Sequence, residues 1–147
     1  MPVLNLPPAD LKIQKREGKE YVWDCLRKQY IRLTPEEFVR QNFIAYLTDY
    51  KNYPAGRLAN EVCISLGNVS KRCDTILYDD FLQPLMIIEY KAPAISINQK
   101  TFDQIARYNM SLKVPWLLVS NGIQHFCCRI GENEVIFEKE IPDFEKL

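Results

Sequence analysis

The alternation of hydrophobic and polar residues predicts a β-hairpin at the start of the chain and a series of strands after it. Residues 11–16 and 20–24 alternate on either side of Glu17-Gly18-Lys19, as is typical of two strands joined by a turn. Two later segments, 85–88 and 116–119, are apolar without a break, as expected for strands in the middle of a sheet with both faces covered. We therefore expect further strands, separated by polar turns, at residues 58–66, 72–79, 84–91, 115–120, 123–130 and 135–137.

Two segments have the start signals and the spacing of amphipathic helices. Thr34-Pro35-Glu36-Glu37 offers an N-cap threonine, a proline at the first helical position and a glutamate three residues after the cap. This helix should run to about Tyr50, with an apolar stripe of Val39, Phe43, Tyr46, Leu47 and Tyr50. The sequence Ser96-Ile97-Asn98-Gln99 resembles a capping box and should open a second helix that runs to about Lys113. Its inner stripe should be made of Phe102, Ile105, Ala106 and Asn109.

The order of these elements predicts the fold class. A hairpin, a helix, three strands, a helix and three strands fit an α/β (α+β) fold in which helices flank a mixed central β-sheet. A chain of 147 residues has the usual length of a single domain. We expect residues 1–147 to form one domain, with an N-terminal hairpin extension at 1–33 and a core at 34–147.

Composition and motifs exclude several classes of protein. Hydrophobic residues at 47% and charged residues at 26% describe an ordinary globular domain. No segment is long enough to cross a bilayer and no signal peptide is recognisable, so we expect a cytoplasmic protein without membrane contact. The five cysteines lack C-x-x-C spacing, which argues against a zinc ribbon or a disulfide framework. The motifs of serine hydrolases, P-loop motors and dinucleotide enzymes are absent from the sequence.

The charges are balanced overall but unevenly distributed. A formal net charge of zero argues mildly against a protein that coats nucleic acid through bulk electrostatics. The N-terminal quarter is nevertheless rich in cations, at Lys12, Lys15, Arg16, Lys19, Arg27, Lys28 and Arg32. A basic hairpin that touches phosphates and ordinary scattered surface charge are both compatible with this pattern, and the second is the commoner situation.

A charged triplet ends the most apolar strand and points to chemistry. In Glu89-Tyr90-Lys91 the glutamate and the lysine should face one side of the strand and the tyrosine the other. Two such charges at the end of a buried strand are costly unless they pair or bind something. Asp74 lies in the preceding strand. An acid on one strand and E-x-K on the next is the arrangement that a metal-dependent nuclease needs, although a structural Glu89–Lys91 salt bridge with Asp74 capping a turn would also explain these residues.

Three stretches of the sequence together resemble a known family. They are 33–41 at the start of the first helix, Lys71-Arg72-Cys73-Asp74 with Ile88-Glu89-Tyr90-Lys91-Ala92-Pro93, and Gln104-Ile105-Ala106-Arg107-Tyr108 in the second helix. Their order is similar to that of the PD-(D/E)XK nuclease superfamily, and most similar to the N-terminal nuclease-like domain of type I restriction enzyme R subunits. The residue before Asp74 is a cysteine where the motif has proline. The resemblance implies a restriction-endonuclease-like core.

The resemblance also implies a metal-dependent hydrolysis of phosphodiester bonds in DNA. Asp74 and Glu89, with the carbonyl of Tyr90 and several waters, would bind Mg²⁺ or Mn²⁺. The metal would polarise the phosphate and help to generate a hydroxide. Lys91 would orient or activate the attacking water, or neutralise charge at phosphorus.

The roles of the outer candidates remain open at the sequence level. Glu61 is either a further acidic ligand or a solvent-facing glutamate at the start of a strand. Glu37 is explained by its place in the capping box, and the resemblance implies that an acid in this helix can also complete the site. Gln104 and Tyr108 are neighbours on one helical face, so they either line the active site as a Q-x-x-x-Y element or form a surface pair without a role. Lys71 and Arg72 would meet phosphates or remain edge charges.

The resemblance also leads to expectations about partners and activity. DNA is the expected partner, and a homodimer would allow both strands to be cut. R subunits need an ATP-driven translocase, whose motif the sequence lacks, so we expect either a free-standing relative or a protein that works with a separate translocase or specificity subunit. The alternative function is a non-catalytic module that binds DNA or protein on the same scaffold.

Overall fold

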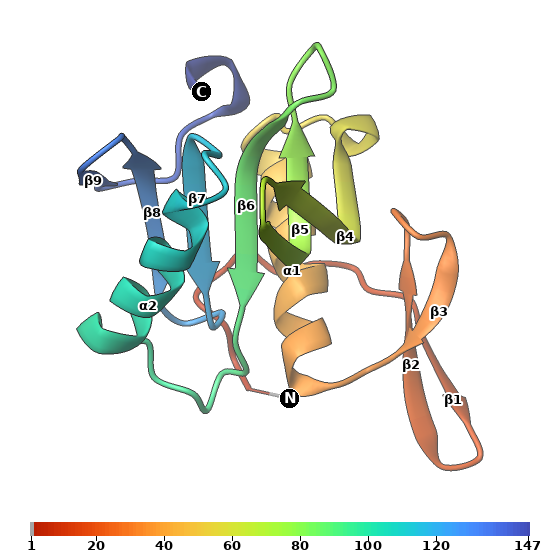
Figure 1. Cartoon of the computed structure of the whole chain (residues 1–147). Coiled ribbons are helices and arrows are strands. Elements are labelled where there is room, and N and C mark those ends of the chain that lie inside the picture. Colours follow the sequence, from red (N-terminus) through yellow and green to blue (C-terminus); the bar gives the residue numbers. More distant parts are fainter. Residues whose placement is uncertain (1) are drawn as a thin grey trace.

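The structure is a computed structural model that describes residues 2–147. Over these residues it contains a three-stranded sheet, a six-stranded sheet, two α-helices and two short 3-10 helices (Figure 1). The elements, in chain order, are β1 (Ile13–Arg16), β2 (Lys19–Asp24), β3 (Gln29–Arg32), α1 (Pro35–Tyr50), η1 (Ala55–Arg57), β4 (Leu58–Leu66), β5 (Val69–Tyr78), β6 (Pro84–Tyr90), α2 (Gln99–Met110), β7 (Trp116–Ser120), β8 (His125–Ile130), β9 (Val135–Glu138) and η2 (Phe144–Lys146).

The main sheet is mixed, as the sequence predicts. Its strands lie in the order β4-β5-β6-β7-β8-β9, and every neighbouring pair is antiparallel except β6–β7, which is parallel. The parallel pair requires a crossover connection, and α2 provides it. The predicted α+β class is therefore confirmed. No helix within the described part of the chain is long and apolar enough to cross a membrane.

The two helices cover opposite faces of this sheet, each over its own hydrophobic core. Val39, Phe43 and Leu47 of α1 pack against one face, which includes Ile88 and Leu118. Phe102 and Ala106 of α2 pack against the other face, which includes Ile87, Leu117 and Cys128. Because successive residues of β6 and β7 are buried on alternate faces, the central residues of both strands are apolar, which explains the unbroken runs at 85–88 and 116–119.

The helix ends agree with the prediction at α1 and differ at α2. Thr34 caps α1 by accepting a hydrogen bond from the Glu37 N–H (3.1 Å), and Pro35 is the first helical residue. The cap of α2 is Asn98, whose side chain accepts from the Thr101 N–H (2.8 Å), so the prediction of a cap at Ser96 is wrong by two residues. The α2 helix also ends at Met110, before Lys113. Tyr50, expected in the apolar stripe, is 58% exposed because α1 ends there, beyond the edge of the core.

The N-terminal extension is a three-stranded antiparallel sheet and not a simple hairpin. The strands β1, β2 and β3 pair in sequence order, and Figure 1 shows them to one side of the main sheet with the β1–β2 turn pointing away from it. The sequence pattern did not predict β3, a four-residue strand that follows a turn closed by Asp24, which accepts from the Leu26 N–H at 2.8 Å. Val22 is completely buried, so one face of this sheet is in contact with the rest of the protein.

Candidate active site

A pocket of about 380 Å³ lies where β5 and β6 separate, next to α2. Five of the residues predicted from the sequence to form the catalytic site line it. The lining consists of Glu36, Lys71, Asp74, Glu89, Tyr90, Lys91, Gln104, Ile105 and Tyr108. Residues from α1, β5, β6 and α2 thus meet at one place.

The Asp74 side chain continues the hydrogen bonding between β5 and β6 beyond the last backbone pair. The last residue pair between β5 and β6 is Thr75–Ile88, and beyond it the Asp74 carboxylate accepts a hydrogen bond from the Tyr90 N–H at 2.9 Å. Burial raises the pKa of the Asp74 carboxyl above its ordinary value, against the opposing effects of the Tyr90 N–H and of Arg40. The fold therefore keeps at this position a carboxylate that it does not stabilise fully, a common property of functional sites.

Glu89 and Lys91 face the same pocket, as the strand alternation predicts, and Tyr90 points the other way. The Tyr90 hydroxyl donates to Thr75 (3.0 Å) in the core beneath α1, and its ring lies 6.2 Å from that of Phe43. The ion-pair partner of Glu89 is Lys71 of β5, and it is not Lys91. The structural interpretation based on a Glu89–Lys91 salt bridge is therefore wrong, and Lys91 carries its charge into the pocket without that partner.

The Gln104–Tyr108 pair lines the pocket from α2. Both side chains belong to its wall, on a helical face separate from buried Phe102 and Ala106. The Tyr108 hydroxyl donates to the Ser70 carbonyl (2.7 Å), and the Lys71 ammonium lies 5.9 Å from the centre of the Tyr108 ring. Tyr108 thus ties α2 to β5 at the mouth of the pocket.

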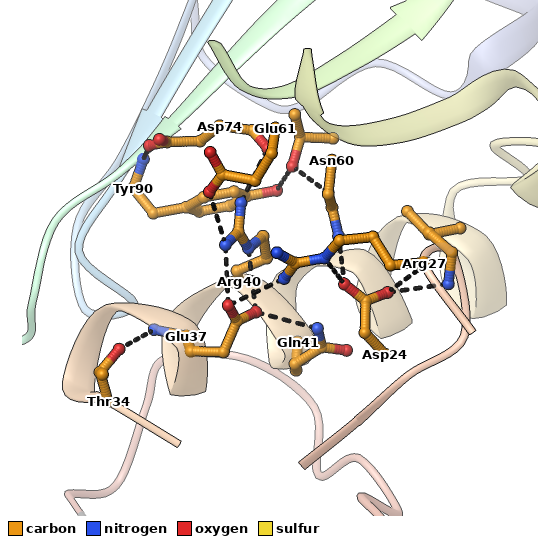
Figure 2. Close-up of polar contacts among 12 residues, drawn as sticks. Asp24, Arg27, Thr34, Glu37, Arg40, Gln41, Asn60, Glu61, Asp74 and Tyr90 are labelled. Carbon is orange, nitrogen blue, oxygen red and sulfur yellow. Dashed lines mark hydrogen bonds and ion pairs between the residues drawn. The ribbon is translucent and has the colours of Figure 1, made fainter. Parts of the chain in front are cut away.

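Glu37 does not line the pocket. Figure 2 shows its carboxylate bonded to Arg40 and Gln41 of the same helix and to Arg27 of the N-terminal segment, at 2.7–3.0 Å. Burial alone would raise the pKa of Glu37, but the bonds from Arg40 and Gln41 outweigh it and hold this pKa below its usual value. The acid that α1 presents to the pocket is the preceding residue, Glu36. The expectation that Glu37 also completes the site is therefore not supported by its position, and the capping-box spacing that drew attention to Glu37 gave no sign of Glu36.

Arg40 connects this charge network to the pocket. It is 7% exposed, and it donates to Glu37 and, at 2.8 Å, to the backbone carbonyl of Asp74 (Figure 2). That carbonyl is available because Glu61 and Asp74 fall opposite each other in β4 and β5 without pairing, between the pairs Asn60–Thr75 and Val62–Cys73. Glu61 itself has φ of +59°, a conformation that is strained for a residue with a side chain.

Glu61 is engaged by cations and is absent from the pocket lining. Its carboxylate pairs with Arg40 (2.9 Å) and with exposed Arg72 (2.8 Å). Burial would raise the pKa of Glu61, but the bonds from Arg72 and Arg40 outweigh it and lower the pKa. As it stands, Glu61 supports Arg40 beneath Asp74, and the structure does not favour the predicted role of a metal ligand.

The donor set fits a hard divalent cation that keeps most of its waters. Asp74, Glu89 and the backbone of Tyr90 reach the same pocket, and Mg²⁺ is often held by one or two carboxylates with water completing the shell. Within residues 2–147, no group of three or more His, Cys, Asp or Glu side chains could hold a metal ion by itself. A cation here would therefore need water or phosphate oxygens to complete its coordination.

Two functional candidates in this region were not predicted from the sequence. Glu36 lines the pocket, and Arg40 donates a hydrogen bond to the Asp74 carbonyl beside it. Lys71, which the sequence left open as a phosphate contact or an edge charge, also lines the pocket. Arg40 gave no signal, because nothing in a helical stripe shows which strand carbonyl a guanidinium will reach.

Two comparisons with known proteins found a match. Residues 35–143 match the profile of a family described as type I restriction enzyme R protein N terminus (HSDR_N). A solved structure described as a cryoEM structure of a DrdV–DNA complex is similar over 69% of this chain, with 21% sequence identity and a TM-score of 0.45. The match covers 10% of the length of that solved chain. No curated protein matches the sequence. The segment matched by the family profile contains every residue that lines the pocket and excludes the N-terminal sheet.

Proposed function

The chain belongs to the family of type I restriction enzyme R protein N termini, and from this premise we propose that it is a metal-dependent DNA endonuclease domain. The observation that carries the proposal is the meeting of Asp74, Glu89 and Lys91 in one pocket. Bringing three charged side chains together costs free energy, because each loses contact with water. A site that binds a metal ion and a phosphate would explain why the fold retains them.

The residues have distinct roles in this proposal. Asp74, Glu89 and the Tyr90 carbonyl would hold Mg²⁺ or Mn²⁺. The bound metal would supply Lewis-acid activation of the scissile phosphate and of an attacking water. Lys91 would orient that water and stabilise negative charge on the phosphate, and Gln104 and Tyr108 would position the DNA strand along α2.

Arg40 would act through Asp74. By holding the Asp74 carbonyl, it fixes the backbone from which the carboxylate extends, while its own guanidinium stays beneath the pocket. We place it among the positioning residues of the site.

A second function is favoured by one specific observation. Lys71 already neutralises Glu89, so a cation would have to displace this amine. The Lys71–Glu89 ion pair would also be expected in a domain that does not hydrolyse DNA and uses the same scaffold to bind DNA or a partner protein. DNA is the proposed ligand of the nuclease, and DNA or a partner protein is that of the binding module. A separate translocase or specificity subunit and a homodimer remain proposals.

Nicking of supercoiled plasmid tests the proposal. Wild type should convert the plasmid to the open-circular form with Mg²⁺ or Mn²⁺ and not in EDTA. Lys91→Ala and Asp74→Ala should abolish this conversion. Lys100→Ala, which removes an exposed lysine of α2 outside the pocket lining, should retain it.

The same proteins separate the two functions. Intact plasmid at high protein concentration, together with no calorimetric signal for Mn²⁺ binding, would end the case for hydrolysis by this domain. DNA binding in EDTA that survives Lys91→Ala would then support the binding module.

A further inference from the structure

One face of the N-terminal sheet carries cations and no carboxylate. Residues that pair directly across antiparallel strands share a face, and so do residues two apart on one strand. The pairs Arg16–Lys19 and Tyr21–Arg32, extended by Lys12 in the same register, bring four cations onto one face. We call the face that carries Lys12, Arg16, Lys19 and Arg32 the basic face.

The acids of the same strands fall on the opposite face. Glu20 pairs with Lys15 and Asp24 with Gln29, in register with buried Val22. The basic face is therefore locally positive although the whole chain has a formal net charge of zero. Its four cations are exposed, and none of them forms an ion pair with another residue among 2–147.

Aromatic rings lie between these cations. Tyr21, Trp23 and Tyr30 belong to the same face by register, and each is half-buried. The Arg16 guanidinium lies 5.7 Å from the ring centre of Tyr21 and 5.4 Å from that of Tyr30, and the Trp23 and Tyr30 rings are 5.2 Å apart. These distances place the Arg16 guanidinium beside the rings, in agreement with the strand register.

We propose that the basic face binds a single strand of DNA. Cations spaced across a sheet suit a chain of phosphates, and partly exposed rings suit the stacking of unpaired bases. A duplex would use the cations but would keep its bases out of reach of the rings. An acidic peptide would likewise leave the rings without a stacking partner.

This surface is separate from the proposed hydrolytic site. Its residues lie outside the segment 35–143 that matches the family, and none of them lines the pocket. Binding at the basic face therefore needs neither a metal nor Lys91. It can be measured whether or not the domain cuts DNA.

The test measures binding of the full chain to a labelled oligo(dT) in EDTA by fluorescence anisotropy. Lys19→Glu and Arg32→Glu should each weaken binding at least about fivefold, and the slope of log K against log salt should become shallower by about 0.7 for each phosphate that the variant no longer neutralises. Lys15→Glu is the matched control, because it makes the same charge change on the opposite face of the same hairpin. It should change the affinity less than about twofold. Melting temperatures of Lys19→Glu and Arg32→Glu should match wild type, and that of Lys15→Glu should be slightly lower, because this change puts a second carboxylate opposite Glu20.

Competing ligands and a pocket variant complete the design. Oligo(dT) should bind more tightly than a duplex of equal length or poly-glutamate, and Lys91→Ala should bind it as wild type does. Equal losses of affinity in Lys15→Glu and Lys19→Glu, or tighter binding of the duplex or of poly-glutamate, would overturn the proposal. If the protein does not nick plasmid, the proposal for the basic face is unaffected. If it nicks plasmid but Lys19→Glu and Arg32→Glu do not weaken oligo(dT) binding, the proposal for the basic face is refuted and the nuclease proposal is not.

Discussion

Replacing Arg40 by methionine should destabilise the protein strongly, although the aliphatic part of the side chain is kept. Arg40 is 7% exposed, and its guanidinium donates to both oxygens of Glu37 and to the Asp74 carbonyl, and pairs with Glu61. Replacing Arg40 leaves the partly buried Asp74 carbonyl without this donor and takes the closest cation from the buried Glu37 carboxylate.

The size of the effect follows from these interactions. Removing one partner of a buried ion pair costs about 3–5 kcal/mol. A buried acceptor left without a donor costs about 1–3 kcal/mol. We expect about 3–5 kcal/mol in total and not the sum, because Arg27 and Gln41 continue to donate to Glu37. For a domain of this size each kcal/mol corresponds to about 2–4 °C, so the melting temperature should fall by about 6–20 °C.

Urea unfolding at pH 7 measures this loss of stability, and two further variants sharpen it. Arg72→Met is the matched control, since Arg72 also pairs with Glu61 but is exposed, and it should leave the unfolding midpoint close to that of wild type. Combining Arg40→Met with Glu37→Met should recover part of the stability, because an apolar pair leaves no unpaired buried charge. A loss below about 1 kcal/mol for Arg40→Met, typical of exposed pairs, would refute the claim that this network is shielded from water.

Three other predictions concern the site, a helix cap and the core. Asp74→Asn should abolish nicking and yet raise the stability of the fold at pH 7. Burial raises the pKa of Asp74 above its ordinary value of 3.8, so the carboxyl contributes most to stability below pH 3.8, and this contribution is lost as the pH rises through the folded-state pKa. The advantage of the variant in thermal melts should therefore shrink as the pH is lowered, and an advantage independent of pH would contradict this assignment. Asn98→Ala should cost about 1 kcal/mol in urea unfolding while Ser96→Ala costs much less, and equal losses would mean that the α2 cap is misplaced. Leu118→Ala should cost about 2–5 kcal/mol and Phe81→Ala, at a position 83% exposed, less than about 0.5 kcal/mol; similar values for the two would show that the β7 core is not close-packed.

The fold could be predicted wherever local signals and burial agree. The first helix begins at Pro35 because the Thr34 cap and the proline act within four residues, and β6 and β7 are apolar because both their faces are covered. Where a signal depends on distant partners, prediction failed. The short strand β3 exists because β2 is beside it, and its four residues alone do not alternate strongly.

The candidate site shows the same division. Strand alternation was enough to place Glu89 and Lys91 on one side, and helical spacing was enough to place Gln104 beside Tyr108. The choice between Glu36 and Glu37, and the pairing of Glu89 with Lys71, depend on how the helix is rotated and on which strand lies next to β6. Neither quantity is a local property of the sequence.

The bond between Arg27 and Glu37 has a practical consequence for anyone who trims the protein. The family profile begins at residue 35, which invites a shortened chain that starts there. Such a cut would remove Arg27 and its 3.0 Å bond to Glu37, together with Val22, which is completely enclosed. A chain cut at the edge of the matched segment should therefore be less stable than the full chain, because α1 would lose a buried contact that lies outside that segment.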